Sequence, residues 1–174
     1  MTVATLSRCA IFNNLDKEYI HYLHDSAKRI AIAKDQYVFH QNDTGEGMYI
    51  VLSGSVNIVL AENDTLSGNH VINTLKQGDF FGEICLLGKQ PRTASAVAAE
   101  DTQLLFIHTE DFARQIDQNN INALKMGFNI ALKLRTHVEK TNAAIINLYK
   151  QISATKAPKE IEKYKLKLLS EVLF

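Results

Sequence analysis

The sequence predicts a mainly β domain, a β-barrel of the jelly-roll type with flanking helices, followed by a long C-terminal helix. Between residues 29 and 108, seven short segments are rich in valine, isoleucine, tyrosine and phenylalanine, and stretches containing glycine and asparagine separate them. Strands of this length and spacing are typical of a barrel or jelly roll. Beyond residue 109 the apolar residues recur every three or four positions, which is the period of a helix.

The first predicted element is a short amphipathic helix over residues 15–27. Asp16 and Glu18 lie in its first turn, where negative charge is favourable. Its apolar face consists of Leu15, Tyr19, Ile20 and Leu23. The predicted strands then follow at residues 29–34, 37–41, 48–54, 55–61, 70–76, 94–99 and 102–108.

Two helices are predicted after the strands, and a third follows a break. Thr109 is a favourable N-cap for a helix over 110–117, and a longer helix spans 121–152. The long helix carries an apolar stripe of Ile121, Leu124, Phe128, Ala131, Leu134, Val138, Ile145, Leu148 and Ile152. A stripe of this length exceeds what one small barrel covers, so we predict a homodimer through this helix, while Met126 and Ile130 face the barrel. Pro158 begins the short helical tail.

The composition excludes several classes of partner. The chain has 19 basic and 19 acidic residues, so its zero net charge offers no electrostatic footprint for nucleic acid or for an anionic membrane. Cys9 and Cys85 lack the paired spacing of zinc sites and disulfide frameworks, which predicts reduced thiols. No long apolar run and no basic leader are present. We therefore expect a soluble, cytoplasmic protein with no metal and no cofactor.

Residues 80–96, FFGEICLLGKQPRTASA, contain the residues that suit a phosphate-bearing ribose. Arg92 is the only arginine or lysine between residues 90 and 113, and a buried guanidinium can bind a phosphodiester through two parallel hydrogen bonds. Gly82 allows close approach of the backbone to a ligand. Glu83, at the start of a short predicted helix, can accept hydrogen bonds from ribose hydroxyls. The alternative is that Glu83 and Arg92 only pair with each other.

This segment resembles the phosphate-binding region of the cyclic nucleotide-binding domains. That family typically has Phe-Gly-Glu followed by three apolar or small residues and, a few positions later, Pro-Arg, a small residue, Ala, and Ser or Thr. The matching residues here are Phe81, Gly82, Glu83, Ile84, Cys85 and Leu86, followed by Pro91, Arg92, Thr93, Ala94 and Ser95. The upstream stretches YVFHQNDTGEG and GMYIVLSGSVNIV also resemble the family, so the likeness covers roughly residues 10–140.

The resemblance implies a role for each matching residue. Glu83 would accept the ribose 2′-hydroxyl, and Arg92 would pair with the cyclic phosphate. The ligand-binding set implied by the resemblance is Gly82, Glu83, Ile84, Cys85, Arg92, Thr93 and Ala94. In the members similar to the catabolite activator, a polar residue of the long helix reaches the base, which here suggests Thr136, His137, Thr141 or Asn142.

Other chemistries have less support in the sequence. His21 and His24 stand three residues apart and could share a metal, but no third ligand is evident. The remaining histidines are not placed with a serine or cysteine in an arrangement that suggests catalysis, so we do not expect an enzyme. A cupin-type barrel would need a cluster of histidines and carboxylates on its strands, and none is evident.

The predicted organisation has three parts. A cyclic nucleotide-binding domain with its N-terminal helix covers residues 1–140, a hinge and long dimerisation helix cover 110–152, and a helical tail covers 153–174. The implied function is that of a receptor for cAMP, with cGMP as the alternative ligand, whose C-terminal helices move to regulate an unidentified partner protein. A transcription factor of the catabolite activator type, or a fragment lacking its DNA-binding domain, is the competing interpretation. Only 22 residues follow Ile152, too few for a DNA-binding domain, so DNA is not an expected partner.

Overall fold

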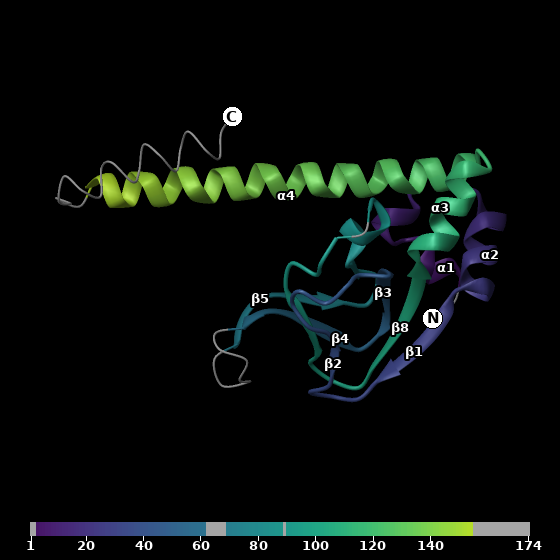
Figure 1. The fold of residues 1–174 in the computed structure, drawn as a ribbon, viewed down its shortest axis with the longest axis horizontal. Coiled ribbons are helices and arrows are strands. Elements are labelled where there is room, and N and C mark those ends of the chain that lie inside the picture. The colour runs from purple at the N-terminus through teal and green to yellow at the C-terminus, as the bar shows by residue number, and fades with distance from the viewer. Residues whose placement is uncertain (1–2, 62–68, 89, 155–174) are drawn as a thin grey trace. The chain divides into compact units, whose positions relative to one another are not determined.

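Two four-stranded antiparallel sheets form the centre of the domain (Figure 1). The computed structural model describes residues 3–61, 69–88 and 90–154. The first sheet has the order β1-β8-β3-β6 and the second has the order β2-β7-β4-β5. The strands are β1 (Lys28–Ile32), β2 (Tyr37–Phe39), β3 (Gly47–Ser53), β4 (Ser55–Ala61), β5 (Asn69–Lys76), β6 (Phe80–Phe81), β7 (Ser95–Ala98) and β8 (Thr102–His108). The predicted jelly-roll class is confirmed, with two separate sheets among the described strands instead of a closed ring.

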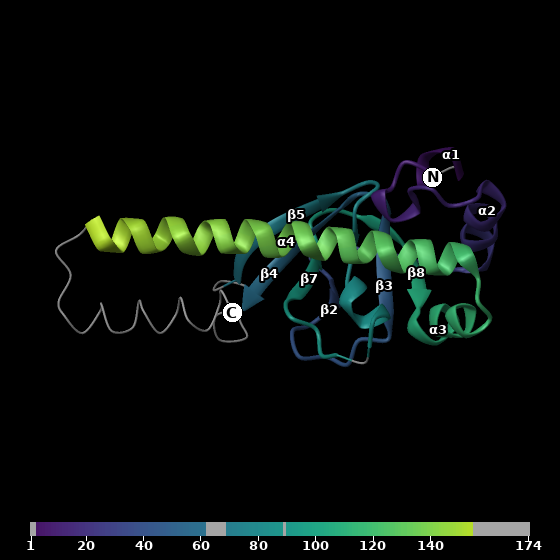
Figure 2. The same cartoon turned by 90° about the horizontal axis from the view of Figure 1, so that it is seen from above.

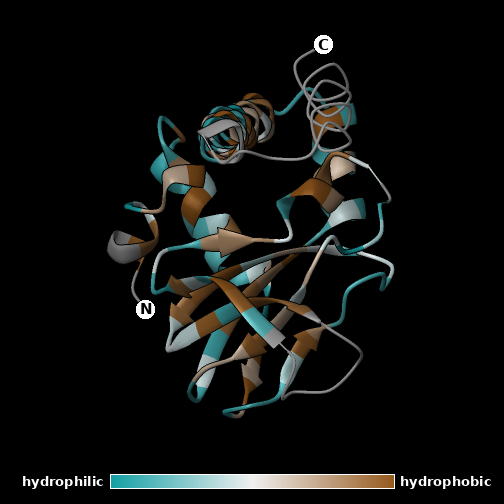
Figure 3. Cartoon of the chain, turned by 90° about the vertical axis from the view of Figure 1, so that its left-hand side faces the viewer, coloured by the Kyte–Doolittle hydropathy of each residue, from teal (hydrophilic) through white to brown (hydrophobic). Residues whose placement is uncertain are grey.

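The sheets form because apolar residues of both meet in one core. Brown and teal stretches alternate along the strands in Figure 3, as expected for strands with one buried face. Leu104 of β8 pairs with Ile30 on one side and with Val51 on the other, so β8 is central in its sheet. The core cluster consists of Val51, Val56, Leu75, Phe81, Ala96 and Leu104. It includes residues of β3, β6 and β8 from one sheet and of β4, β5 and β7 from the other.

The N-terminal residues form a small helical module at one end of the sheets (Figures 1 and 2). It consists of α1 (Val3–Leu6), the 3-10 turn η1 (Ala10–Phe12) and α2 (Lys17–Ser26). The predicted apolar face of α2 is confirmed, since Tyr19, Ile20 and Leu23 are buried. Leu6, Ile11 and Phe12 are also buried, which shows that this module has its own share of the core.

Two helices follow β8, namely α3 (Thr109–Asp117) and α4 (Ile121–Ala154). The predicted N-cap at Thr109 is wrong by one residue, because the Nδ1 atom of His108 accepts the hydrogen bond from the Glu110 N–H at 3.2 Å. Thr109 instead donates its hydroxyl to the Cys85 carbonyl oxygen at 3.0 Å, which ties the start of α3 to residues 80–96. The predicted tail helix beginning at Pro158 lies outside the described residues.

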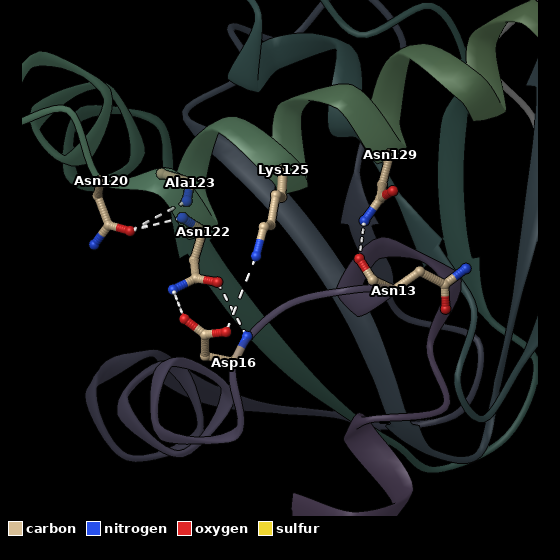
Figure 4. A network of polar contacts seen from close by, with 7 residues as sticks. All are labelled: Asn13, Asp16, Asn120, Asn122, Ala123, Lys125 and Asn129. Carbon is tan, nitrogen blue, oxygen red and sulfur yellow. Dashed lines mark hydrogen bonds and ion pairs between the residues drawn. The ribbon is translucent and has the colours of Figure 1, made fainter.

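Polar contacts fasten the start of α4 to the N-terminal module (Figure 4). The Asn122 amide oxygen accepts from the Asp16 N–H at 3.0 Å, and the Asn122 Nδ2 donates to the Asp16 carboxylate at 3.0 Å. Two turns further on, Asn129 Nδ2 donates to the carbonyl oxygens of Ile11 and Asn13 at 3.0 and 2.9 Å. These four contacts join residues more than 100 positions apart, and we call them the Asn122–Asn129 clamp.

The chain divides into two compact units, Met1–Ile130 and Ala131–Phe174, so that α4 begins in the first and continues in the second. In the first unit, Met126 and Ile130 are fully buried, which confirms that this side of the helix faces the core. Ile121, Leu124 and Phe128 of the predicted stripe are exposed in the single chain. No helix within the described ranges is both long and apolar enough to cross a membrane.

Candidate functional site

Residues 80–96 begin with a sharp turn at Gly82. Gly82 has φ +71°, in the left-handed region, and a Cβ there would lie 2.4 Å from Nη1 of Arg92. The positive φ favours glycine at this position, and any side chain there would displace the Arg92 guanidinium. The turn leads from β6 into a single 3-10 turn, η3 (Glu83–Leu86), and brings Glu83 inside, where it is 6% exposed.

Backbone pairing with a distant loop positions Arg92. The Arg92 N–H donates to the Asp43 carbonyl oxygen, and the Asn42 N–H donates to the Arg92 carbonyl oxygen, each at 2.9 Å. Thr44 and Pro91 form an isolated antiparallel bridge beside this pair. Residues 42–44 therefore form a short ladder with residues 91–92, which fixes the direction in which the Arg92 side chain leaves the backbone.

The guanidinium of Arg92 is buried and has an unused hydrogen-bond donor. The residue is 5% exposed, and Nη1 donates to the Gly82 carbonyl oxygen at 3.2 Å and to Sγ of Cys85 at 3.3 Å. Nε is buried and has no hydrogen-bond partner. An unsatisfied donor on a buried charged group is costly, so this geometry favours a ligand that supplies an acceptor, above all an anion.

Cys85 supports Arg92 from within η3. It is buried, as predicted for a small core residue, and a Cβ at Gly45 would lie only 2.0 Å from its Sγ. The absence of a side chain at Gly45 is thus required by the position of Cys85. The Cys85 N–H donates to the Gly82 carbonyl oxygen at 3.3 Å, so that this oxygen accepts from both Cys85 and Arg92.

Aromatic rings of the two sheets surround the guanidinium. Its Cζ lies 4.1 Å from the ring centroid of Phe39 and 5.5 Å from that of Tyr49. Tyr49 stacks on Phe81, with centroids 5.2 Å apart, and lies 4.9 Å from Phe106. Burial raises the pKa of the Tyr49 hydroxyl, and the charge of Arg92 opposes this rise. Sequence reasoning missed these contacts, because aromatic residues are ordinary in strands and nothing in their spacing indicates a cation beside them.

The structure brings part of the predicted ligand-binding set together. Gly82, Cys85 and Arg92 are in direct contact, and Glu83 is buried on the same turn. Ile84 and Thr93 are exposed, whereas Ala94 is buried. The predicted base contacts Thr136, His137, Thr141 and Asn142 all lie on α4 in the second unit, where the Thr136 hydroxyl donates to the Leu132 carbonyl oxygen at 3.1 Å.

In the histidine pair of α2, neighbouring side chains contact His24. His24 Nδ1 lies 2.7 Å from the Asp25 carboxylate, and Nε2 lies 2.7 Å from Nη2 of Arg29, so protein atoms engage both of its ring nitrogens. Across the described part of the chain, no three or more histidine, cysteine, aspartate or glutamate side chains are grouped to hold a metal.

The fold and the 80–96 segment define a jelly-roll domain with a buried arginine beside a glycine-glutamate turn. A family model described as cyclic nucleotide-binding domain matches residues 29–119, just over half of the chain. The chain belongs to the cyclic nucleotide-binding domain family.

Known proteins of several kinds are similar to this chain. It is 32% identical over 126 residues to the cyclic AMP receptor protein of Thermus thermophilus, covering 72% of this chain and 57% of that protein. It is 30% identical over 125 residues to the cGMP-dependent protein kinase egl-4 of Caenorhabditis elegans, covering 71% of this chain and 16% of the kinase. A co-crystal structure of the regulatory domain of Toxoplasma gondii PKA with cAMP matches with a TM-score of 0.57 and 25% identity, covering 64% of this chain and 42% of that one.

Proposed function

We propose that this chain is a receptor module for a cyclic nucleotide. The observation that carries the proposal is the buried Nε donor of Arg92, which has no hydrogen-bond partner. Glu83, in the same 80–96 segment, is also buried. In this proposal Arg92 pairs with the cyclic phosphate, and Glu83 accepts a hydrogen bond from the ribose 2′-hydroxyl. Gly82, Ile84, Cys85, Thr93 and Ala94 complete the binding surface.

The proposed ligand is cAMP, with cGMP as the alternative. Two of the similar proteins are named for cAMP or were crystallised with it, and one is a cGMP-dependent kinase. We propose that Thr136, His137, Thr141 or Asn142 contacts the base. Because the relatives are much longer than this chain, the activity of a whole protein containing this domain belongs to the proposal as well.

The proposed output is a movement of the C-terminal helices. The Thr109 hydroxyl contacts the Cys85 carbonyl, so a change at the ligand site reaches the start of α3 directly. Phe112 of α3 is buried, and its ring lies against Gly127, where a Cβ would be 3.7 Å from Cζ. Ligand binding would favour one of two positions of α3 and α4 through its different affinity for them.

We further propose that the module acts as a homodimer and performs no chemistry. The exposed stripe of α4 residues favours a second copy as the partner, since Phe128 is 65% and Val138 58% exposed in the single chain. In this proposal the regulated partner is a protein. Two free cysteines favour the cytoplasm as the place of action.

Calorimetric titration with cAMP and cGMP tests the receptor function, together with chromatography for the linear nucleotide product. The proposal predicts saturable binding of at least one nucleotide and recovery of that nucleotide unchanged. Failure of both nucleotides to bind, or conversion to the linear product, would contradict it.

A further inference from the structure

Phe39 stands out among the residues around Arg92 because no proposed ligand contact explains it. Its ring centroid lies 4.1 Å from Cζ of the guanidinium, closer than the Tyr49 ring at 5.5 Å. Phe39 belongs to β2, and its pairing with Ala96 of β7 places it beside the strand that directly follows Arg92 in the chain. A register shift between Tyr37 and Phe39 interrupts the ladder next to this residue.

A cation held over an aromatic face is attracted by the negative charge density of that face. The attraction is strongest where water is excluded, and Arg92 is buried, with only 5% of its surface exposed. In addition, Nη1 donates to the Gly82 carbonyl oxygen and to Sγ of Cys85. The Phe39 ring and these two acceptors together restrain the guanidinium, while the buried Nε donor has no hydrogen-bond partner.

An arginine side chain has many rotamers, and fixing one of them before a ligand arrives lowers the entropy that binding must offset. We infer that Phe39 is a positioning residue, which acts through Arg92 by holding the guanidinium in the orientation that presents Nε to an anionic ligand. This inference rests on the proposed function for the identity of the ligand, the phosphate of a cyclic nucleotide. The hold on Arg92 itself does not depend on any ligand.

Four variants separate positioning from general packing. Phe39→Leu and Phe39→Met remove the aromatic face, and the flexible methionine fills most of the space, so that at least one folded variant is expected. Phe39→Tyr keeps the face and is the conservative rescue. Phe106→Leu is the matched control, because Phe106 belongs to the same group of rings and its nearest partner there is Tyr49, at 4.9 Å.

The first readout needs no nucleotide. In a proton–nitrogen correlation spectrum of the arginine Nε–H groups, the Arg92 signal is assigned by its loss in Arg92→Lys. Ring currents of Phe39 should give this signal an unusual proton shift, which disappears in Phe39→Leu and Phe39→Met and persists in Phe39→Tyr and Phe106→Leu.

The second readout is the affinity for cAMP, measured by calorimetry. Loss of one buried cation–π contact should weaken binding about three- to tenfold in Phe39→Leu and Phe39→Met. Phe39→Tyr and Phe106→Leu should stay within about twofold of the wild type. An Arg92 signal that Phe39→Met leaves in place, or equal weakening by Phe39→Leu and Phe106→Leu, would overturn the inference. If the wild type binds no nucleotide, the proposed function fails, and the Nε spectrum alone decides whether Phe39 positions Arg92.

Discussion

Replacing Asn122 with alanine should loosen the joint between α4 and the N-terminal module without touching the ligand site. Asn122 is buried and makes two reciprocal hydrogen bonds with Asp16, one to its backbone N–H and one from Nδ2 to its carboxylate. Asp16 is the N-cap residue of α2, but its side chain makes no capping hydrogen bond. The carboxylate is thus directed to α4 and not to its own helix.

The expected loss follows from these contacts. A neutral hydrogen bond contributes about 1 kcal/mol, and one to a charged group contributes about 2 kcal/mol. Alanine is the better helix former by roughly 0.6 kcal/mol, which offsets part of this loss within α4. The free energy of unfolding should therefore fall by about 2 kcal/mol in Asn122→Ala.

Urea denaturation of a double-mutant cycle measures the contact. Asn122→Ala, Asp16→Ala and the double variant should give a coupling energy of about 1–2 kcal/mol. Asn13→Ala is the matched control, because Asn129 contacts only the Asn13 carbonyl and the Asn13 side chain points away from it (Figure 4). The control should change stability by less than about 0.5 kcal/mol. Additive losses in the cycle, with coupling below about 0.3 kcal/mol, would refute the reasoning.

Three further predictions concern other parts of the chain. Gly82→Ala should unfold more easily, because alanine is strained at φ +71°, and it should lose its response to cAMP in a thermal shift assay, because the new Cβ would displace Nη1 of Arg92. Gly88→Ala, with no atom within 4 Å of the new Cβ, should resemble the wild type. Val138→Glu should yield monomers in light scattering where the wild type is dimeric; a monomeric wild type at high concentration would contradict the dimer. Burial raises the pKa of Tyr19 to about 12, above its ordinary value of 10.0. The folded state therefore favours the protonated hydroxyl, and the free energy of unfolding should decrease as the pH rises from 10 to 12. Urea titrations should show a smaller decrease in Tyr19→Phe.

The local chemistry of the sequence was sufficient to predict most elements of the fold. Seven of the observed strands coincide with predicted ones, because alternating β-branched and aromatic residues between turns report directly on a half-buried strand. The strand Phe80–Phe81 was missed, since two residues are too short for any period. The N-terminal elements α1 and η1 were missed for the same reason.

The candidate site divides in the same way. Gly82, Glu83 and Arg92 were predictable because they lie within one short segment, where residue type and order carry the information. The contact of Phe39 with Arg92 and the Asn122–Asn129 clamp were not predictable, because each depends on how distant segments pack. Asn129 contacts Ile11 and Asn13 across more than 100 positions, and no periodicity indicates such a pair.

The central claim is that Arg92 binds the phosphate of a cyclic nucleotide, and a thermal shift series tests it most directly. Wild type, Arg92→Ala, Arg92→Lys and Glu83→Gln are melted with and without cAMP and cGMP. Loss of a buried charge-assisted contact costs about 2–5 kcal/mol, so affinity in Arg92→Ala should fall by about two orders of magnitude. Arg92→Lys should recover only part of it, because an ammonium group lacks the planar fork, and Glu83→Gln should lose less than Arg92→Ala.

If Arg92 binds the phosphate, nucleotide raises the melting temperature of the wild type, and this rise disappears in Arg92→Ala. If Arg92 and Glu83 instead only hold the loop together, both Arg92→Ala and Glu83→Gln would melt at lower temperature and no nucleotide would raise the melting temperature of the wild type. That second result would contradict the account.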